Sequence, residues 1–123
     1  MRLGAYTANL AAKSVARQAY GEDTAIDRHR HRYEVNQEFL PKLIAAGMKV
    51  SGLSPDGTFV EIVEYAEHPW FLACQFHPEY KSRPLAPHPL FREFVAAAYR
   101  HKQARRSTVA FQDQDAVTAN PHR

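Results

Sequence analysis

The sequence contains only one cysteine and no long apolar run. Cys74 has no second cysteine with which to form a disulfide within the chain, as expected of a protein from a reducing cytoplasm. No apolar stretch approaches the roughly 20 residues that a membrane-spanning helix needs. Tyr6, Thr7 and Asn9 interrupt the apolar residues near the start, where a signal peptide would need a continuous run. We therefore expect a cytoplasmic protein with no signal peptide and no membrane partner.

The chain also has little excess charge, and that excess lies at one end. The formal net charge is +3 at pH 7, and apolar residues make up 45% and charged residues 24% of the chain, as in soluble globular proteins. After Tyr99, two acidic residues are outnumbered by five basic ones: Arg100, Lys102, Arg105, Arg106 and Arg123. The rest of the chain is balanced. This distribution favours a solvated basic tail over a nucleic-acid partner.

Helical and extended patterns alternate along the chain, which indicates α/β layering. The sequence predicts helices at 14–20, 37–46 (capped by Asn36) and 89–102, and extended segments at 28–33, 48–53, 58–66 and 70–76. The last of these, WFLACQF, does not alternate, which is typical of a strand covered on both faces in a parallel sheet. Such sheets bind substrates outside the carboxyl ends of their strands, where FHPE lies. Beyond Gln103 the sequence is polar and aperiodic, and we expect disorder.

The FHPE motif contains an imidazole and a carboxylate separated by one proline. In an extended chain His77 and Glu79 project to the same side, and Pro78 stiffens the backbone between them. A carboxylate beside an imidazole takes the Nδ1 proton, which leaves Nε2 as a base. The other interpretation is a histidine and a glutamate that merely pair at the surface. The spacing alone favours the surface pair.

A base needs a group to activate, and Cys74 is the nearest thiol. It lies three residues before His77, an odd offset that places the two side chains on opposite faces of a strand. It also lies within an apolar run, where a free cysteine usually packs as a small hydrophobic residue. We expect Cys74 to belong to the core, so these residues do not include a nucleophile.

The segment RHRHRYEV places three arginines on one face of an extended chain and His29, His31 and Tyr33 on the other. Three interpretations compete. A metal site at the two histidines would need further ligands, a nucleic-acid strip would need more interleaved aromatics, and an arginine fork would bind a carboxylate. The chemistry of the residues predicts a charged edge segment with one functional arginine at most.

Six segments, taken in order, resemble the carboxyl-terminal part of the CTP synthase family: MRLG, DRHRHRYEVN, VEIVE, HPWFLACQFHPE, S-R-P and HPLFREFVAAA. More broadly, FHPE is similar to the catalytic end of class I glutamine amidotransferases. The resemblance implies an α/β, flavodoxin-like layered sheet with flanking helices. It covers residues 1–103 as a partial amidotransferase domain and leaves 104–123 as an unmatched, disordered basic and polar tail.

The resemblance also implies roles for four residues. His77 and Glu79 match the histidine and glutamate of a Cys-His-Glu triad, which hydrolyses glutamine through a thioester and releases ammonia. Arg32 matches an arginine that binds glutamine, and the Tyr33 main chain lies against this substrate. The ammonia passes to an amino-terminal synthetase domain, where ATP phosphorylates UTP and ammonia displaces the phosphate. The resemblance thus places ATP and Mg in that domain, implies a homotetramer, and implies no cofactor or metal in this chain.

The sequence departs from the family pattern in one important respect. The family's nucleophile lies on an upstream G-x-C-x-G elbow with oxyanion-hole glycines, and this sequence contains neither. We therefore expect a fragment or the product of a truncated gene that is inactive by itself and, with an uncovered sheet, unstable alone. The alternatives are another class I amidotransferase, a non-catalytic binding or regulatory protein, and nucleic-acid binding through RHRHR and the tail.

Overall fold

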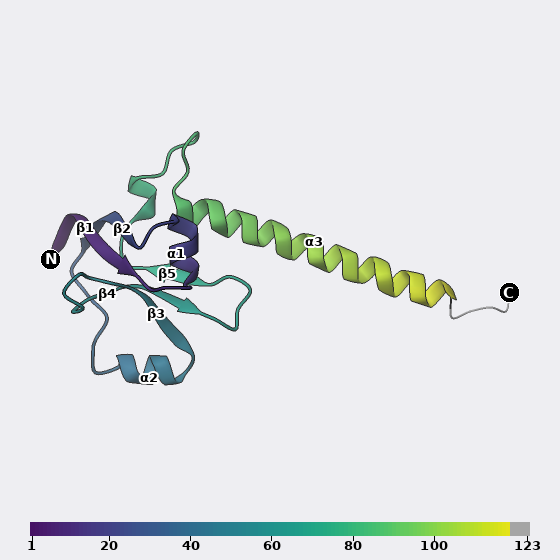
Figure 1. The fold of residues 1–123 in the computed structure, drawn as a ribbon, viewed down its shortest axis with the longest axis horizontal. Coiled ribbons are helices and arrows are strands. Elements are labelled where there is room, and N and C mark those ends of the chain that lie inside the picture. Colours follow the sequence, from purple (N-terminus) through teal and green to yellow (C-terminus); the bar gives the residue numbers. More distant parts are fainter. Residues whose placement is uncertain (119–123) are drawn as a thin grey trace.

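The computed structural model describes residues 1–118, and the side chains of residues 1–112. One five-stranded sheet has the strand order β2-β1-β3-β4-β5, with helices beside it (Figure 1). The strands are β1 (Arg2–Leu10), β2 (Thr24–His31), β3 (Met48–Leu53), β4 (Val60–Tyr65) and β5 (Leu72–Cys74). The helices are α1 (Val15–Tyr20), α2 (Leu40–Ala45), the 3₁₀ turn η1 (Pro78–Tyr80) and α3 (Pro89–Thr118).

The α/β class predicted from the sequence is confirmed, but the parallel sheet is not. Each of the four strand pairings in the described part of the chain is antiparallel. Short turns explain the pairings of β3 with β4 and of β4 with β5, because only antiparallel neighbours can be joined by a few residues. Between β3 and β4, the Asp56 carboxylate accepts hydrogen bonds from Ser54 Oγ (2.5 Å) and from the Thr58 amide (3.0 Å). The strand β1 was not predicted, since residues 1–3 were too short a segment to assign from the sequence.

The expectation that residues 70–76 form the most buried strand is wrong. β5 has only three residues, pairs with β4 alone, and follows Phe71, which is 41% exposed. The most buried strand is β4, where Ile62 is 0% exposed. Its position explains this, because β4 lies between β3 and β5 whereas β5 forms the edge. FHPE therefore follows an edge strand.

Helix α1 is held at both of its ends and from the sheet below. Ser14 accepts a hydrogen bond from the Arg17 amide (3.0 Å), and Gly21 ends the helix with φ of 72°, which favours glycine. Glu64 on β4 accepts from the Val15 amide (3.1 Å) and the Ala16 amide (2.7 Å). The helix thereby covers the apolar core: Leu10, Ala16, Ala19, Ala25, Ile62, Phe76 and Leu90.

The start of α3 is anchored to β2 and α1 by buried polar groups. His88 Nε2 lies 2.9 Å from Asp27 Oδ1, and the Tyr20 hydroxyl donates to Asp27 Oδ2 at 2.6 Å. Burial, with Asp27 as the second cause, raises the pKa of the Tyr20 hydroxyl, so Tyr20 remains a donor. Arg92 adds a hydrogen bond from Nη2 to the Ala19 carbonyl (3.0 Å). These contacts fix the direction in which the helix leaves the sheet.

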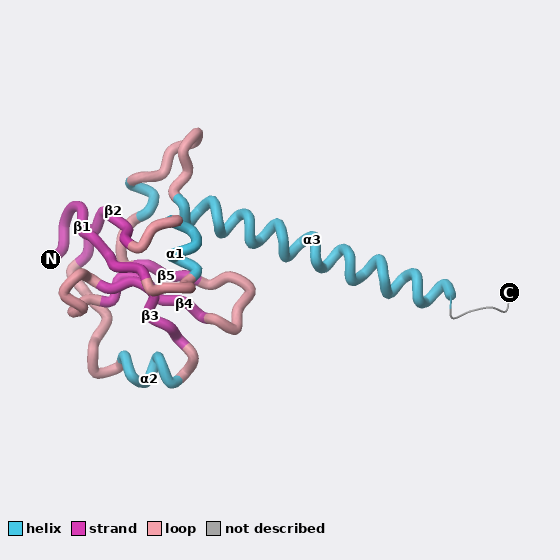
Figure 2. The backbone as a smooth tube through the Cα atoms, in the orientation of Figure 1, coloured by secondary structure: helices cyan, strands magenta, loops and turns pink. Residues whose placement is uncertain are grey.

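Two helix boundaries differ from those predicted. Asn36 does not cap α2: its side chain accepts from the Glu38 amide (2.9 Å) in a turn, and the helix begins at Leu40. Helix α3 continues past Gln103, where disorder was expected, to Thr118 (Figure 2). The reason is compositional, since residues 90–118 contain no glycine or proline and many good helix formers. The expectation for residues 119–123 lies outside the described residues.

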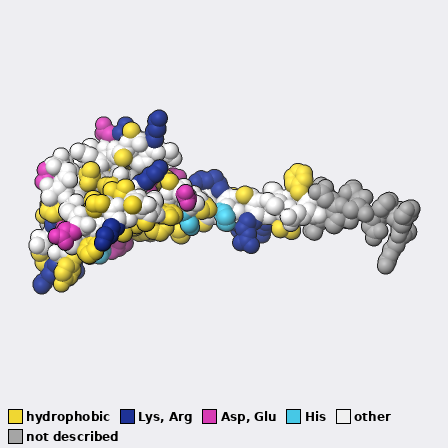
Figure 3. Space-filling view, turned by 90° about the horizontal axis from the view of Figure 1, so that it is seen from below, with side chains coloured by type: hydrophobic (Ala, Val, Ile, Leu, Met, Phe, Trp, Pro, Cys, Tyr) yellow, Lys and Arg dark blue, Asp and Glu magenta, His cyan; other side chains and the backbone are white. Residues whose placement is uncertain are grey.

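Most of α3 points away from the sheet into solvent. Leu90 is buried, whereas Phe94, Val95 and Tyr99 are more than half exposed, so the apolar side chains of this helix pack only at its beginning. Lys and Arg side chains lie along its described part (Figure 3). Of the helices that the structure describes, none has the length and apolar character to cross a membrane.

The cap that Glu64 provides for α1 generates a stability prediction. Glu64→Gln keeps the shape of the side chain but turns one amide donor toward the helix N–H groups. We expect a loss of about 1–3 kcal/mol of unfolding free energy, measured by urea denaturation of the 123-residue chain. The matched control is Glu67→Gln, which alters an exposed glutamate after β4. Equal unfolding midpoints for the two variants would contradict the role of Glu64.

Candidate functional site

His77 and Glu79 come together just after β5. The His77 amide donates to the Arg28 carbonyl on β2 (2.9 Å), which fixes the chain where it leaves the sheet. Pro78 then begins η1, and this 3₁₀ turn, rather than an extended chain, brings Glu79 back toward the imidazole. His77 Nδ1 lies 2.7 Å from Glu79 Oε1. The contact expected from the sequence therefore forms, although by a different backbone conformation.

The electrostatics of this pair define which nitrogen is available. The hydrogen bond from His77 is the main cause that holds the pKa of the Glu79 carboxyl below its usual range, so Glu79 is ionised. An ionised carboxylate only accepts, so Nδ1 carries the shared hydrogen and Nε2 of the neutral ring carries a lone pair. Tyr80 stacks on the imidazole, with ring centroids 4.9 Å apart and planes inclined by 13°. The His77 side chain is 37% exposed, so Nε2 belongs to an accessible base.

Cys74 does not serve this base. Its side chain packs against the core cluster, and its thiol lies 3.5 Å from the Phe76 carbonyl, to which it donates. Burial raises the pKa of the thiol to about 12, so the reactive thiolate is scarce near neutral pH. The structure thus agrees with the core role expected for Cys74.

Arg32 and Tyr33 follow the end of β2. Along the strand the alternation is as expected, since Arg28 and Arg30 are exposed whereas His29 is buried. The alternation stops at His31, and the Tyr33 side chain is 84% exposed instead of continuing the histidine face.

The main chain at Tyr33 lies beside the end of β5. Its carbonyl accepts from Gln75 Nε2 (2.8 Å) and lies 3.0 Å from His31 Nδ1. Gln75 is two residues before His77, so the segment containing Arg32 is tied to the strand that leads into the His-Glu pair. Within the described residues, no hydrogen bond or ion pair joins Arg32 itself to His77.

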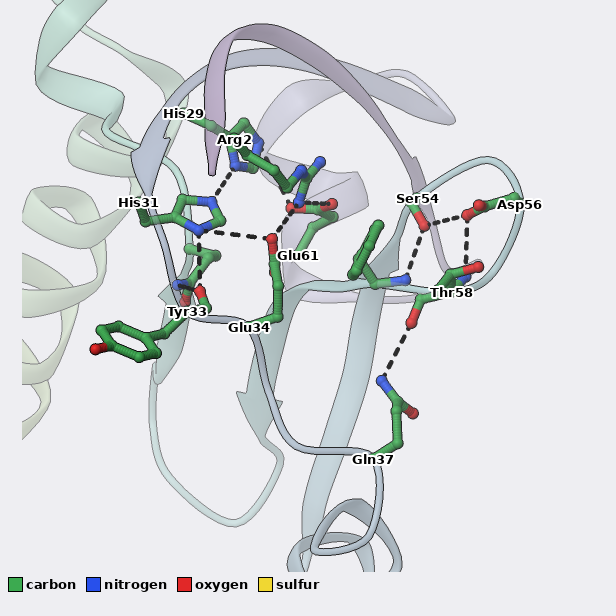
Figure 4. A network of polar contacts seen from close by, with 12 residues as sticks. Arg2, His29, His31, Tyr33, Glu34, Gln37, Ser54, Asp56, Thr58 and Glu61 are labelled. Carbon is green, nitrogen blue, oxygen red and sulfur yellow. Dashed lines mark hydrogen bonds and ion pairs between the residues drawn. The ribbon is translucent and has the colours of Figure 1, made fainter.

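The structure also contains a buried polar network that sequence reasoning missed (Figure 4). Arg2 Nη1 lies 2.6 Å from Glu61 Oε1 and 3.3 Å from Glu34 Oε1. The contact with Glu61 is an ion pair whose angles are not those of a hydrogen bond. His29 Nε2 lies 3.5 Å from Glu61 Oε2, and His29 Nδ1 lies 2.8 Å from His31 Nε2. The alternation of β2 predicted that the histidines share a face. Nothing in the sequence indicated Arg2 and Glu61, because they come from distant strands.

The two histidines do not form part of a metal cluster. Among the side chains of residues 1–112, which the structure describes, no three from His, Cys, Asp or Glu are arranged to hold a metal ion. His29 is 2% exposed, and burial, followed by the charge of Arg2, lowers its pKa to about 4. His29 is therefore an uncharged ring, and its short contact with His31 is a hydrogen bond.

Comparisons with known proteins match this sequence and this fold. The chain is 50% identical to the CTP synthase of Koribacter versatilis over 125 aligned residues, which cover 100% of the chain and 22% of the relative. It is 59% identical to the CTP synthase of Moorella thermoacetica over 81% of the chain and 19% of the relative. The chain thus spans about a fifth of the length of these relatives.

A solved structure and a family model agree with these relatives. The glutaminase domain of Trypanosoma brucei CTPS, with bound acivicin, matches with a TM-score of 0.76 and 38% identity over 81% of this chain and 40% of that one. The family model described as glutamine amidotransferase class-I matches residues 2–97. The chain therefore belongs to the class I glutamine amidotransferase family.

Proposed function

We propose that this chain supplies part of the glutamine-hydrolysing site of a CTP synthase. In this proposal His77 is the general base, Glu79 orients it, and Arg32 with the Tyr33 main chain holds glutamine. The observation that carries the proposal is the 2.7 Å contact between His77 Nδ1 and an ionised Glu79, beside an accessible Nε2. The similarity to CTP synthases over 80% or more of the chain supports it.

The chemistry follows from the state of the imidazole. Nε2 takes the proton of a thiol, and the thiolate attacks the side-chain carbonyl carbon of glutamine. His77 then returns the proton to the departing nitrogen, so that ammonia leaves and a thioester remains. The same nitrogen next takes a proton from water, which attacks the thioester carbon. The carbon–sulfur bond breaks, glutamate leaves, and the proton returns to the departing sulfur. Glu79 stays ionised and stabilises the imidazolium that forms in each step.

The thiol in this scheme is not Cys74, which is the only cysteine in the sequence. Its raised pKa and its place against the core leave no route by which His77 would activate it. A cysteine elsewhere in the complete protein must supply the nucleophile. We therefore expect the 123-residue chain to release no ammonia from glutamine by itself.

The complete protein would use the ammonia in a synthetase domain. There ATP phosphorylates UTP, and ammonia displaces the phosphate to give CTP. ATP and Mg would bind that domain and not this chain, and the synthetase domain would be its main partner within a homotetramer. A regulatory protein or another amidotransferase would share the fold but would not support CTP formation.

The activity test uses a full-length enzyme in which this chain replaces the matching segment of the Koribacter versatilis CTP synthase, to which it aligns over its whole length. We expect His77→Ala to lower glutamine-dependent CTP formation by about 10²-fold or more, because general-base catalysis contributes that much. Ammonia-dependent formation should not change, since it bypasses the base. The rates of both reactions are compared by the absorbance of CTP.

The control for this test is His101→Ala, which removes an exposed histidine on α3. It should leave both reactions at the rate of the unsubstituted enzyme. An equal fall in glutamine-dependent and ammonia-dependent rates in His77→Ala would show that His77 supports the fold rather than the chemistry. Absence of glutamine-dependent activity in the unsubstituted enzyme, with ammonia-dependent activity intact, would contradict the proposed function itself.

The hydrogen bond between His77 and Glu79 makes a separate prediction about pH. The pKa of the Glu79 carboxyl is lower in the folded chain than in the unfolded chain, so ionised Glu79 stabilises the fold at pH values above its ordinary pKa. This stabilisation is lost as pH falls through the folded-state pKa. His77→Ala removes the main cause of the shift, so the pKa of Glu79 should rise toward the usual range. Carbon NMR of the Glu79 carboxyl measures it. Tyr80→Phe keeps the stacked ring and should leave the pKa unchanged; an identical Glu79 pKa in all three proteins would contradict the assigned hydrogen bond.

A further inference from the structure

Four polar groups form a continuous chain from the middle of the sheet to the proposed substrate segment. Glu61 Oε2 on β4, a buried oxygen without a hydrogen-bond partner, lies 3.5 Å from His29 Nε2, and His29 Nδ1 lies 2.8 Å from His31 Nε2. His31 Nδ1 lies 3.0 Å from the Tyr33 carbonyl oxygen. Figure 4 shows that the two imidazoles and the carbonyl follow one another along the end of β2. Side-chain exposure falls from 11% at His31 to 0% at Glu61, so these groups are largely shielded from bulk solvent.

The Tyr33 carbonyl, the last group in this series of polar contacts, fixes where the hydrogens lie. A carbonyl oxygen only accepts, so His31 Nδ1 must carry a hydrogen to bind Tyr33. If His31 is neutral, its Nε2 is then an acceptor, and His29 Nδ1 must donate to it. Neutral His29 in turn presents a lone pair on Nε2 toward Glu61. An ionised Glu61 also presents lone pairs, so this last contact would oppose two acceptors.

Reversing the hydrogens does not remove the conflict. If His29 Nε2 donates to an ionised Glu61, then His29 Nδ1 accepts from His31 Nε2, and neutral His31 is left with a lone pair facing the Tyr33 carbonyl. One contact in the chain is therefore always unfavourable when both rings are neutral and the carboxylate is charged. A single extra proton resolves all three contacts, wherever it resides, and always places a hydrogen on His31 Nδ1.

We propose that Glu61, His29 and His31 are positioning residues that share one proton, and that this proton holds the Tyr33 carbonyl and the adjoining Arg32 in place for glutamine. The inference rests on the proposed function, because glutamine is the ligand it assigns to this segment. Gln75 also binds the Tyr33 carbonyl, so loss of the proton weakens the site without abolishing it.

The charges around the network decide where the proton resides. Burial raises the pKa of Glu61 against the opposing effect of Arg2, whereas burial and Arg2 lower the pKa of His29 to about 4. These two shifts favour the proton on Glu61 over His29. The other charged or titratable groups that face the network are Glu34, 3.6 Å from His31 Nδ1, the Tyr6 ring, which packs edge-on against His29, and, at longer range, Asp27 and His77.

The sign of the pH dependence follows from that position. The pKa of Glu61 is higher in the folded chain than in the unfolded chain, so protonated Glu61 stabilises the fold. This stabilisation is complete at pH values below the ordinary carboxyl pKa, and it is lost as pH rises through the folded-state pKa. The hydrogen bond to Tyr33 should weaken over the same range. The KM for glutamine should therefore rise with pH in the unsubstituted enzyme.

The variant Glu61→Gln isolates this effect. Its amide nitrogen donates permanently to His29 Nε2, and its oxygen still faces Arg2, so the chain of hydrogen bonds is complete without an extra proton. We expect the KM for glutamine in Glu61→Gln to stay low and to lose the rise with pH. Glu67→Gln, which removes a carboxylate outside the network, should retain the rise.

His31 gives a second pair of variants. His31→Ala removes the donor to Tyr33 and should raise the KM for glutamine about fivefold, as expected for one lost hydrogen bond, with little change in kcat. His31→Asn places an amide donor near the position of Nδ1 and should restore a low KM at every pH. Ammonia-dependent CTP formation should be the same in all of these enzymes.

A readout that needs no activity separates this inference from the proposed function. Nitrogen NMR of labelled imidazoles in the reconstituted full-length enzyme should show hydrogen on His31 Nδ1 and, as pH rises, loss of one proton from the network that is absent in Glu61→Gln. Hydrogen on Nε2 alone, or the same proton loss in Glu61→Gln, overturns the inference. So does a glutamine-active enzyme whose pH dependence of KM survives Glu61→Gln. The predicted NMR result without any glutamine activity would instead overturn the proposed function.

Discussion

The structure depends on the alternation of side chains along β2. Because successive residues of a strand face opposite sides, Asp27 and His29 turn inward while Arg28 and Arg30 remain in solvent. Asp27 anchors His88 at the start of α3 (2.9 Å), and His29 joins the buried network with Glu61. The backbone of the same strand accepts a hydrogen bond from the His77 amide, so β2 fixes both parts of the proposed site.

Much of the fold follows from local sequence signals, and the errors have a common cause. Ser14 and Gly21 bound α1 as local chemistry requires, and the segment from Ser54 to Gly57 turns between the two extended segments predicted at 48–53 and 58–66. Strand direction and burial were misjudged because they depend on neighbours distant in sequence. WFLACQF is apolar enough for a central strand, but β5 pairs with β4 alone and stays at the edge.

In the candidate site, too, the residues close in sequence were predicted and those that meet across distant strands were not. His77 and Glu79 were found because two residues carry the chemistry and lie close in sequence. The buried network was not found, since Arg2 and Glu61 meet only when β1 and β4 assemble into one sheet, and a lone arginine or glutamate in a strand carries no signal. Resemblance to known motifs gave roles to Arg32 and Tyr33. The structure adds a physical reason for their placement, namely the hydrogen bond from Gln75 to the Tyr33 carbonyl.

The central claim is that His77 serves a thiol that this chain does not contain. The most direct measurement is the structure of the reconstituted enzyme, with a glutamine analogue bound but not attached, which locates the nucleophilic sulfur. The account predicts His77 Nε2 within hydrogen-bond reach of that sulfur, at about 3–3.5 Å, with Glu79 still on Nδ1. A sulfur beyond that reach, or a different base beside it, would contradict the account.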